Sequence, residues 1–573
     1  MRTTLILLMI AAAALSAASP ATAYKTMIPA GKSAIVHISN GSVSDTQLPE
    51  EPLDATTLEA VKRAPAWLYW ELIRNLSLLQ PDLRIKCAEL ILNAQDPYID
   101  EIAFCVAHLA PEDLSRMDLS LIQKNAMLIY ETAGQLKYVK IIDHGIAGID
   151  RDYYSTTSYR VGNGKKICVN ELPRDIYYWY IVHPKITREL PDYIDPATGE
   201  HGEPGAGVFW RDYLYNHNDP GRLLLKNILS TCEVLWCGKK NDPDNGAIGA
   251  ISQWLKENIK FCTPPKRQFQ PVRVYNFHEG RCSECGYLNT AAARTALIPC
   301  LLSTAYADNH KWNEFYDRRW IQWEPIGMMM DAPGTYDKWK DFPVTGVFNW
   351  RGDGYVWNST DHYSAACKLR VRLTDLSGNP IDGAQVIVDN PGGYPKERCL
   401  WSYTDNKGEC SLNLGDELQT FEARIRSGIG LIDGKFKINR SITAEVYTWS
   451  PVYYGQIRKP AAVPFELKCP DGMQLDFSVT VESELLQGQN PDDNSTFCLT
   501  QAGKIDLYLC DAENYARYLS GMQFSAALVL KNVSSLHSSV KIPAEGNWYL
   551  IFSNEGKVNA AECIKAKVEC SFL

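Results

Sequence analysis

The chain has 573 residues, which is too long for one compact core and predicts roughly three or four domains. Its content of 45% hydrophobic and 22% charged residues is typical of a globular protein. The net charge is −9 and no block of lysine and arginine runs along the sequence, which argues against nucleic acid or an anionic membrane as a partner.

The N-terminus has the pattern of a secretory signal peptide. Arg2 supplies a positive charge, residues 5–18 are apolar, and the tripeptide Ala-Thr-Ala at 21–23 fits a cleavage site. The apolar stretch is short for a membrane anchor, and no later segment is long and apolar enough to span a bilayer. We therefore expect residues 1–23 to be removed and the protein to be exported, either to the periplasm or to the extracellular space.

Cysteine usage fits an exported protein. The 17 cysteines predict several disulfide bonds, and the odd number leaves at least one thiol unpaired. A nucleophilic thiol would account for the odd number, although parity alone does not point to a particular residue.

The first half of the chain reads as helices followed by mixed structure. After an irregular or extended leader, apolar residues recur three and four positions apart from residue 54, and we assign 24–150 to a helical N-terminal region. Residues 151–240 are rich in Tyr, Trp, Gly and Pro, which predicts loops and short strands. A turn and helix follow in NDPDNGAIGAISQWLKENIKF, and HKWNEFYD and RRWIQWEP predict two strands joined by a tight turn.

The hydrophobic period changes to two after about residue 364. This pattern predicts a small β-sandwich at 365–455 and a second all-β unit at 456–573, with Pro460–Pro464 as the hinge between them. The predicted fold class is multidomain α+β, with a helical N-terminal region, an α+β domain at 151–364 and two C-terminal antiparallel β-sandwiches.

Cys282 lies where a thiol can act as a nucleophile. The turn EGRC precedes a predicted helix, so the sulfur would sit at the positive end of a helix dipole, which lowers the pKa of a thiol. His310 on the following strand could pair with the thiol. Glu324 on the next strand could reach the imidazole if both side chains face the same side of the hairpin.

These segments resemble the core of the transglutaminase-like superfamily of papain-fold cysteine enzymes. The family pattern is G-x-C before a helix, then H-x-W-x-E-x-Y, then W-x-x-x-D-P. Within 240–330 the matching residues are Gly280, Cys282, His310, Trp312, Glu314, Tyr316, Trp320, Glu324 and Pro325. The third catalytic residue of the family is usually Asp, so Glu324 departs from the pattern.

The resemblance implies a papain-like catalytic domain that performs acyl transfer on protein or peptide amides. Cys282 would be the nucleophile and would also supply an oxyanion-hole N–H from its backbone, while His310 would be the general base and acid and Glu324 the orienting carboxylate. Hydrolysis by a peptidase or amidase is the preferred outcome, and the alternatives are amine transfer, as in cross-linking, or a non-catalytic binding or surface protein. The resemblance implies no cofactor and no metal. The C-terminal units resemble carboxypeptidase-regulatory or immunoglobulin-like sandwiches.

Other roles remain open for the same residues. Cys282 and Cys285 form a C-x-x-C, which could be a disulfide, a redox pair or, with Cys300 and His310, part of a zinc shell. His278 is an alternative base, and His310 could be an ordinary core histidine. The aromatic residues of the hairpin are expected to pack within the strands rather than contact substrate, and Glu314 is either a buried hydrogen-bonding group or a solvated one.

Overall fold

The computed structural model describes two strands at 22–28 and 33–37, residues 53–453 with short gaps, and separate pieces from residue 467 onward. Most of the expected signal peptide and the expected hinge at Pro460–Pro464 lie outside the described residues.

Successive helices follow residue 54, as the helical period predicts. They are α2 (Ala55–Arg63), α3 (Tyr69–Leu78), α4 (Pro81–Asn93), α5 (Ile99–His108), α6 (Pro111–Arg116) and α7 (Ser120–Ala133). The carboxylate of Asp54 caps α2 by accepting the backbone N–H of Thr57 at 2.8 Å. Proline begins α4 and α6, where the first turn needs no N–H donor. Every residue of α5 is buried, so this helix lies at the centre of the group.

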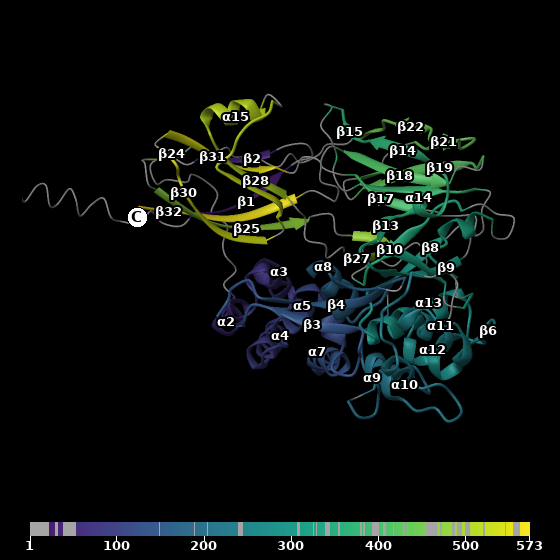
Figure 1. Cartoon of the computed structure of the whole chain (residues 1–573). Coiled ribbons are helices and arrows are strands. Elements are labelled where there is room, and N and C mark those ends of the chain that lie inside the picture. Colours follow the sequence, from purple (N-terminus) through teal and green to yellow (C-terminus); the bar gives the residue numbers. More distant parts are fainter. Residues whose placement is uncertain are drawn as a thin grey trace, which may run out of the picture.

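The leader that precedes these helices forms sheet with the other end of the chain. β1 (Thr22–Ile28) pairs antiparallel with β32 (Glu562–Phe572), and β2 (Ser33–His37) pairs antiparallel with β31 (Gly546–Ser553). Figure 1 shows the two purple strands among the yellow C-terminal strands. β1 also includes the last residues of the expected signal peptide.

The region between the N-terminal helices and the central sheet has short strands and loops, as predicted, together with short helices. The strands β3 (Val139–His144), β4 (Tyr154–Asn163) and β5 (Lys166–Glu171) form an antiparallel sheet. The other elements up to residue 280 are α8 (Arg174–Tyr177), the π-helix η2 (Tyr178–Val182), α9 (Trp210–Asn216), α10 (Leu225–Ser230), α11 (Gly246–Asn258), β6 (Lys260–Phe261), α12 (Pro271–Phe277) and β7 (Glu279–Gly280).

A six-stranded antiparallel sheet in the order β11-β10-β9-β8-β12-β13 forms the middle of the chain. Its strands are β8 (Cys300–Ala305), β9 (His310–Tyr316), β10 (Trp320–Glu324), β11 (Met329–Met330), β12 (Phe348–Trp350) and β13 (Val356–Asn358). The helix α13 (Cys282–Thr295) packs against β8 and β9. Gly286 permits this close packing, because a Cβ atom there would lie 2.5 Å from Cδ1 of Leu302.

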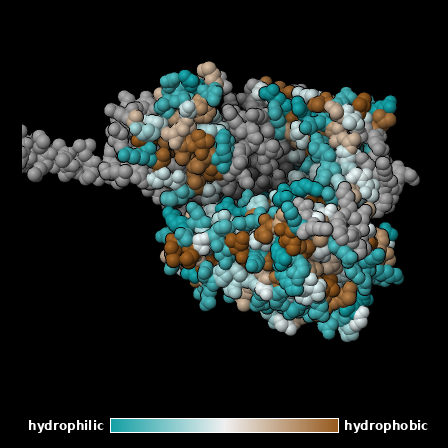
Figure 2. All heavy atoms as spheres, in the orientation of Figure 1, coloured by the Kyte–Doolittle hydropathy of each residue, from teal (hydrophilic) through white to brown (hydrophobic). Residues whose placement is uncertain are grey.

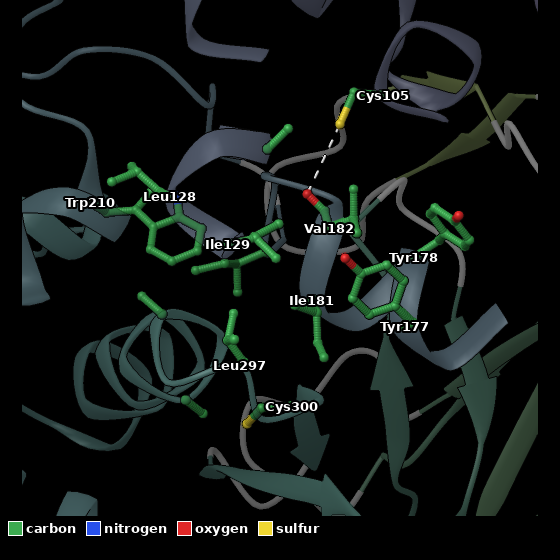
Figure 3. Packing of buried hydrophobic residues seen from close by; sticks show 14 of the residues in the cluster. Cys105, Leu128, Ile129, Tyr177, Tyr178, Ile181, Val182, Trp210, Leu297 and Cys300 are labelled. Carbon is green, nitrogen blue, oxygen red and sulfur yellow. Dashed lines mark hydrogen bonds between the residues drawn. The ribbon is translucent and has the colours of Figure 1, made fainter. Parts of the chain in front are cut away.

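One hydrophobic core joins the N-terminal helices to α13 and the central sheet. Figure 3 shows Leu128 and Ile129 of α7 and Trp210 of α9 on one side of this core, with Leu297 and Cys300 below them. The helices and the central sheet therefore share their buried surface.

Two adjacent carboxyl groups of α5 lie inside this core. Asp100 is 1% exposed and Glu101 is 0% exposed. The hydroxyl of Tyr178 donates to Asp100, and that of Tyr177 donates to Glu101 at 2.8 Å. Burial raises the pKa of both carboxyls, and the negative charge of Asp100 raises the pKa of Glu101 further. The folded protein therefore retains a proton on this pair at a pH where the unfolded chain has released it.

Replacing Glu101 by Gln is expected to flatten the pH dependence of folding stability. In the unfolded chain Glu101 titrates near about pH 4.3, so its contribution is complete below that pH and is lost as the pH rises through the raised pKa of the folded state. The amide keeps an acceptor for Tyr177 and does not titrate. Urea unfolding between about pH 4 and pH 8 measures the difference. The wild type should lose stability relative to Glu101→Gln as the pH rises, and parallel curves would contradict the prediction.

The change of period after residue 364 corresponds to strands, as expected. A short helix α14 (Thr360–Tyr363) precedes the strands β14 (Ala366–Arg372), β15 (Thr374–Asp375), β16 (Gln385–Asp389), β17 (Leu400–Tyr403), β18 (Glu409–Gly415), β19 (Phe421–Ser427), β20 (Gly430–Leu431), β21 (Phe436–Ile438), β22 (Val446–Trp449) and β23 (Val452–Tyr453). The expectation of purely antiparallel pairing is wrong here, because β22 runs parallel to β14 and β23 runs parallel to β15. Between β14 and β22 the chain forms a separate sheet from β16, β17, β19, β20 and β21, while β18 returns to pair with β14.

The described C-terminal part contains two larger sheets, in the orders β1-β32-β25-β30 and β2-β31-β28-β29, with β24 also paired to β31, and one sheet of two strands, β26 and β27. The elements not yet named are β24 (Leu467–Cys469), β25 (Met473–Ser483), β26 (Gln487–Gln489), β27 (Thr496–Cys498), β28 (Ile505–Asp511), α15 (Ala512–Leu519), β29 (Leu528–Val533) and β30 (Ser535–Lys541). The sequence predicted only strands here, so α15 is an addition. The chain is thus mixed α and β, with helices toward the N-terminus and many sheets toward the C-terminus, as expected for a multidomain α+β protein.

The surface is mixed in character. Figure 2 shows several brown groups of hydrophobic residues among teal hydrophilic residues on the face in view. Within the ranges that the structure describes, no helix has the length and apolar character needed to cross a bilayer.

The expected disulfide bonds are not found among the cysteines whose side chains are described. Cys87, Cys105, Cys285 and Cys300 are buried thiols. They lie on different elements of the core, where they pack as small apolar side chains.

Candidate functional site

Cys282 is the first residue of α13. The preceding turn is held by Glu284, whose carboxylate accepts the backbone N–H of Arg281 at 3.1 Å. Gly280 is required in this turn, since a Cβ atom there would lie 2.6 Å from the Cβ of Glu284. The sulfur therefore lies at the N-terminal end of a 14-residue helix, as expected, and Cys282 is partly exposed.

His310 and Glu324 lie on the two strands of the predicted hairpin. In the register of β9 and β10, Gln322 is opposite Glu314, and alternate residues of each strand share a face. His310 and Glu324 consequently face the same side. Nε2 of His310 and Oε2 of Glu324 are 3.1 Å apart, and both side chains are 9% exposed.

The thiol of Cys282 completes a hydrogen-bonded series with this pair. It is hydrogen-bonded to the imidazole of His310 and to the backbone N–H of Lys311. Because Nε2 of His310 contacts Glu324, Nδ1 is the nitrogen that remains for the sulfur. The structure thus brings together all three residues that the sequence singled out.

The electrostatics of the series favour a thiolate and an imidazolium. Burial opposes ionisation of Cys282, but the hydrogen bond and charge of His310 outweigh it and lower the pKa of the thiol. Burial also opposes the charging of His310, but its hydrogen bonds to Cys282 and Glu324 raise the pKa of the imidazole. The lowered pKa of Cys282 and the raised pKa of His310 each favour the charged form of the group.

The alternative roles for the neighbouring cysteines do not fit their positions. Cys285 is a buried thiol one turn further along α13, and burial raises its pKa. Cys300 pairs with Phe315, whereas Ala305, at the other end of β8, pairs with His310. Cys300 is therefore too far along the strand to join His310 in a zinc shell. Across the described ranges, no group of three or more Cys, His, Asp and Glu side chains could hold a metal ion.

His278 contacts groups other than the Cys282 thiol. Its Nε2 lies 2.9 Å from Oδ2 of Asp219, and its Nδ1 lies 3.1 Å from the carbonyl oxygen of Asn258. Both ring nitrogens are engaged with these groups, so the geometry favours His310 as the partner of Cys282.

The aromatic residues of the hairpin pack within the core, as expected. Trp312 is 1% exposed and stacks on Tyr336 with ring centroids 4.3 Å apart. Trp323 is 0% exposed, and its Nε1 donates to Oγ of Ser252 at 2.8 Å. Trp312 and Trp323 therefore pack into separate hydrophobic clusters.

Glu314 is a buried hydrogen-bonding group and not a solvated residue, which was one of the two alternatives predicted for it. It is 0% exposed and accepts hydrogen bonds from the hydroxyl of Tyr363 and, at 3.2 Å, from Nδ2 of Asn349. Burial raises the pKa of this carboxyl to about 7, despite these hydrogen bonds.

Two residues next to Glu324 were missed in the sequence. Tyr336 lies in the 3₁₀ helix η3 (Pro333–Lys338), is 3% exposed, and its hydroxyl is hydrogen-bonded to Glu324. Nε2 of Gln322 donates to the same hydroxyl at 2.8 Å. The alternation of β10 could have placed Gln322 beside Glu324, but the irregular segment that carries Tyr336 has no period to indicate its direction.

Residues 237–325 match the family model of the transglutaminase-like superfamily. This segment contains Cys282, His310 and Glu324, together with α11, α12, α13 and the strands β8 to β10. The match covers a small part of the chain. No curated protein matches the sequence.

Several solved structures have weak similarity to the chain. A streptococcal ancillary pilin is 8% identical over 44% of this chain and 72% of its own, with a TM-score of 0.14. The shaft pilin SpaA from Lactobacillus rhamnosus GG is 8% identical over 35% of this chain and 91% of its own, with a TM-score of 0.14. A DUF3823 family protein from Parabacteroides merdae is 14% identical over 35% of this chain and 96% of its own, with a TM-score of 0.14. At these TM-scores the similarities carry no argument about fold or function.

Proposed function

We propose that the chain is an exported cysteine enzyme that hydrolyses amide bonds in proteins or peptides. The observation that carries this proposal is the hydrogen-bonded series from Cys282 through His310 to Glu324, inside the segment that matches the transglutaminase-like superfamily. The lowered pKa of the Cys282 thiol and the partial exposure of that residue support a nucleophilic role.

The proposed reaction has two steps. The Cys282 thiolate attacks the amide carbonyl carbon, the His310 imidazolium protonates the leaving nitrogen, and the C–N bond breaks to leave a thioester. Neutral His310 then takes a proton from water, whose oxygen attacks the thioester carbonyl. The C–S bond then breaks, which releases the carboxylic acid and restores the Cys282 thiolate beside protonated His310. Glu324 keeps the imidazole oriented, and the Cys282 backbone N–H at the start of α13 stabilises the oxyanion.

We also propose domain boundaries and roles for the rest of the chain. We place the catalytic domain at 151–364 and regard the units at 365–455 and 456–573 as β-sandwiches that hold or present the substrate. The many strands of both units support this assignment, as does the period of two in their sequence. Removal of residues 1–23 would leave most of β1 in place, so the pairing of β1 with β32 is compatible with export.

Alkylation of the purified protein with limiting iodoacetamide near pH 6 tests the proposal. An ordinary thiol with a pKa of about 8.5 is almost wholly protonated there, so the Cys282 thiolate should react roughly 100-fold faster. Peptide mass mapping identifies the labelled residue, and buried Cys285 is the internal comparison. The variant His310→Ala should lose the selective labelling.

The result decides between the enzyme and the other candidates. Equal labelling of Cys282 in the wild type and in His310→Ala would argue for a binding protein that keeps the fold without turnover. If labelling is selective but a fluorescent primary amine becomes attached to substrate proteins, the thioester is resolved by amines, and the reaction is cross-linking rather than hydrolysis.

A further inference from the structure

The hydrogen-bonded series extends beyond Glu324 to Gln322. Oε1 of Gln322 accepts the backbone N–H of Ala332 at 2.9 Å, and its Nε2 donates to the hydroxyl of Tyr336 at 2.8 Å. An amide has one accepting end and one donating end, so the bond from Ala332 determines which end faces Tyr336. The Tyr336 oxygen therefore accepts a hydrogen bond from Gln322.

The hydrogen bond from Gln322 determines which group accepts the O–H of Tyr336. The hydroxyl is also hydrogen-bonded to Glu324. A phenol has a single O–H donor, and the bond with Gln322 uses its oxygen as an acceptor, so the O–H is donated to Glu324. Glu324 must then accept from Tyr336 and also from His310, whose Nε2 lies 3.1 Å away. This arrangement requires the proton of His310 on Nε2 and leaves Nδ1 for Cys282.

The ring of Tyr336 packs closely against other aromatic rings. It stacks on Trp312 with ring centroids 4.3 Å apart, and its centroid lies 5.5 Å from that of His310. Tyr363 packs against the same Trp312 at 4.8 Å. These residues belong to a small buried cluster, so the phenol has little freedom to move.

We propose that Tyr336 is a positioning residue, whose hydroxyl holds the Glu324 side chain where it can orient His310. This inference rests on the proposed function, since it assigns a role within the same series. It also accounts for the glutamate at a position where the family usually has aspartate. The extra methylene of glutamate adds a rotatable bond, and a second hydrogen bond from a buried donor removes the added freedom.

The variant Tyr336→Phe tests the role directly, because it keeps the stacked ring and removes only the hydroxyl. The rate of iodoacetamide reaction with Cys282 at pH 6 is expected to fall about 10-fold, in line with the loss of a hydrogen bond to a charged group. The midpoint of the pH–reactivity curve should move to higher pH. Tyr363→Phe is the matched control, because it removes a buried hydroxyl from the same cluster that serves Glu314 instead, and it should leave the curve unchanged.

The outcomes separate this inference from the proposed function. If the wild type is selectively alkylated and folded Tyr336→Phe gives the same pH–reactivity curve, the positioning role is wrong and the proposed function stands. If the wild type itself is not selectively alkylated, the proposed function fails first.

A second variant covers the case in which Tyr336→Phe does not fold. Incorporation of 3-fluorotyrosine at position 336 gives a more acidic phenol of nearly the same shape, which donates a stronger hydrogen bond to Glu324. The pH–reactivity curve should then move to lower pH. An unchanged curve in this variant would overturn the inference.

Discussion

Glu324→Gln is expected to slow the acylation of Cys282 by roughly 10,000-fold, which is the effect of the equivalent change in a serine-protease triad. Tyr336 donates its O–H toward this side chain. The carbonyl oxygen of the new amide would accept that hydrogen bond, and its NH2 group would face Nε2 of His310. The imidazole would then carry its proton on Nδ1, toward the sulfur, which is the wrong tautomer for a base.

The aspartate variant separates the charge from the reach of the side chain. Glu324→Asp keeps a carboxylate and should lose much less activity, about 10-fold, because the shorter group can still accept from His310. Both variants should be compared by single-turnover acylation and by the pH–reactivity curve of Cys282. Equal losses in the two variants would contradict the tautomer argument and would indicate that only the position of the carboxyl group matters.

The parts of the site that could be predicted were those with local sequence signals. A turn before a helix indicated the position of Cys282, and the alternation of two adjacent strands indicated that His310 and Glu324 share a face. Tyr336 had no such signal. It reaches Glu324 from an irregular segment, and its direction depends on the stack with Trp312, which is a tertiary contact. Propensity and period describe neighbours along the chain and do not determine such contacts.

For the fold as well, elements with a local sequence period were predicted, and pairings between distant segments were not. The helices after residue 54 and the strands after residue 364 were predicted by their periods, because each element buries one face. The pairing of β1 with β32 joins strands from opposite ends of the chain, and the parallel pairing of β14 with β22 spans a whole intervening sheet. The alternation of apolar and polar residues in a strand does not indicate which distant strand it pairs with.

Arg294 is buried at the junction of α13 with the rest of the core, and it is 0% exposed. Its Nε donates to the carbonyl oxygen of Cys300 at 3.0 Å, and its Nη1 donates to those of His183 and Lys185 at 3.2 and 3.1 Å. Burial lowers the pKa of the guanidinium to about 10, so it is charged at neutral pH. A single side chain thus satisfies backbone oxygens from β8 and from the segment after η2.

Arg294→Met is expected to lower the free energy of unfolding by about 3–5 kcal/mol, because it removes the hydrogen bonds that Arg294 donates to these buried carbonyl oxygens. Arg319→Met is the matched control. The Arg319 side chain is 54% exposed and bonds both oxygens of Asp331 at 2.9 Å, so solvent screening should limit its loss to less than about 1 kcal/mol. Urea unfolding of both variants measures the difference. A stable Arg294→Met would mean that relief from burying the charge outweighs the lost hydrogen bonds, as in proteins where apolar residues replace buried ions without loss.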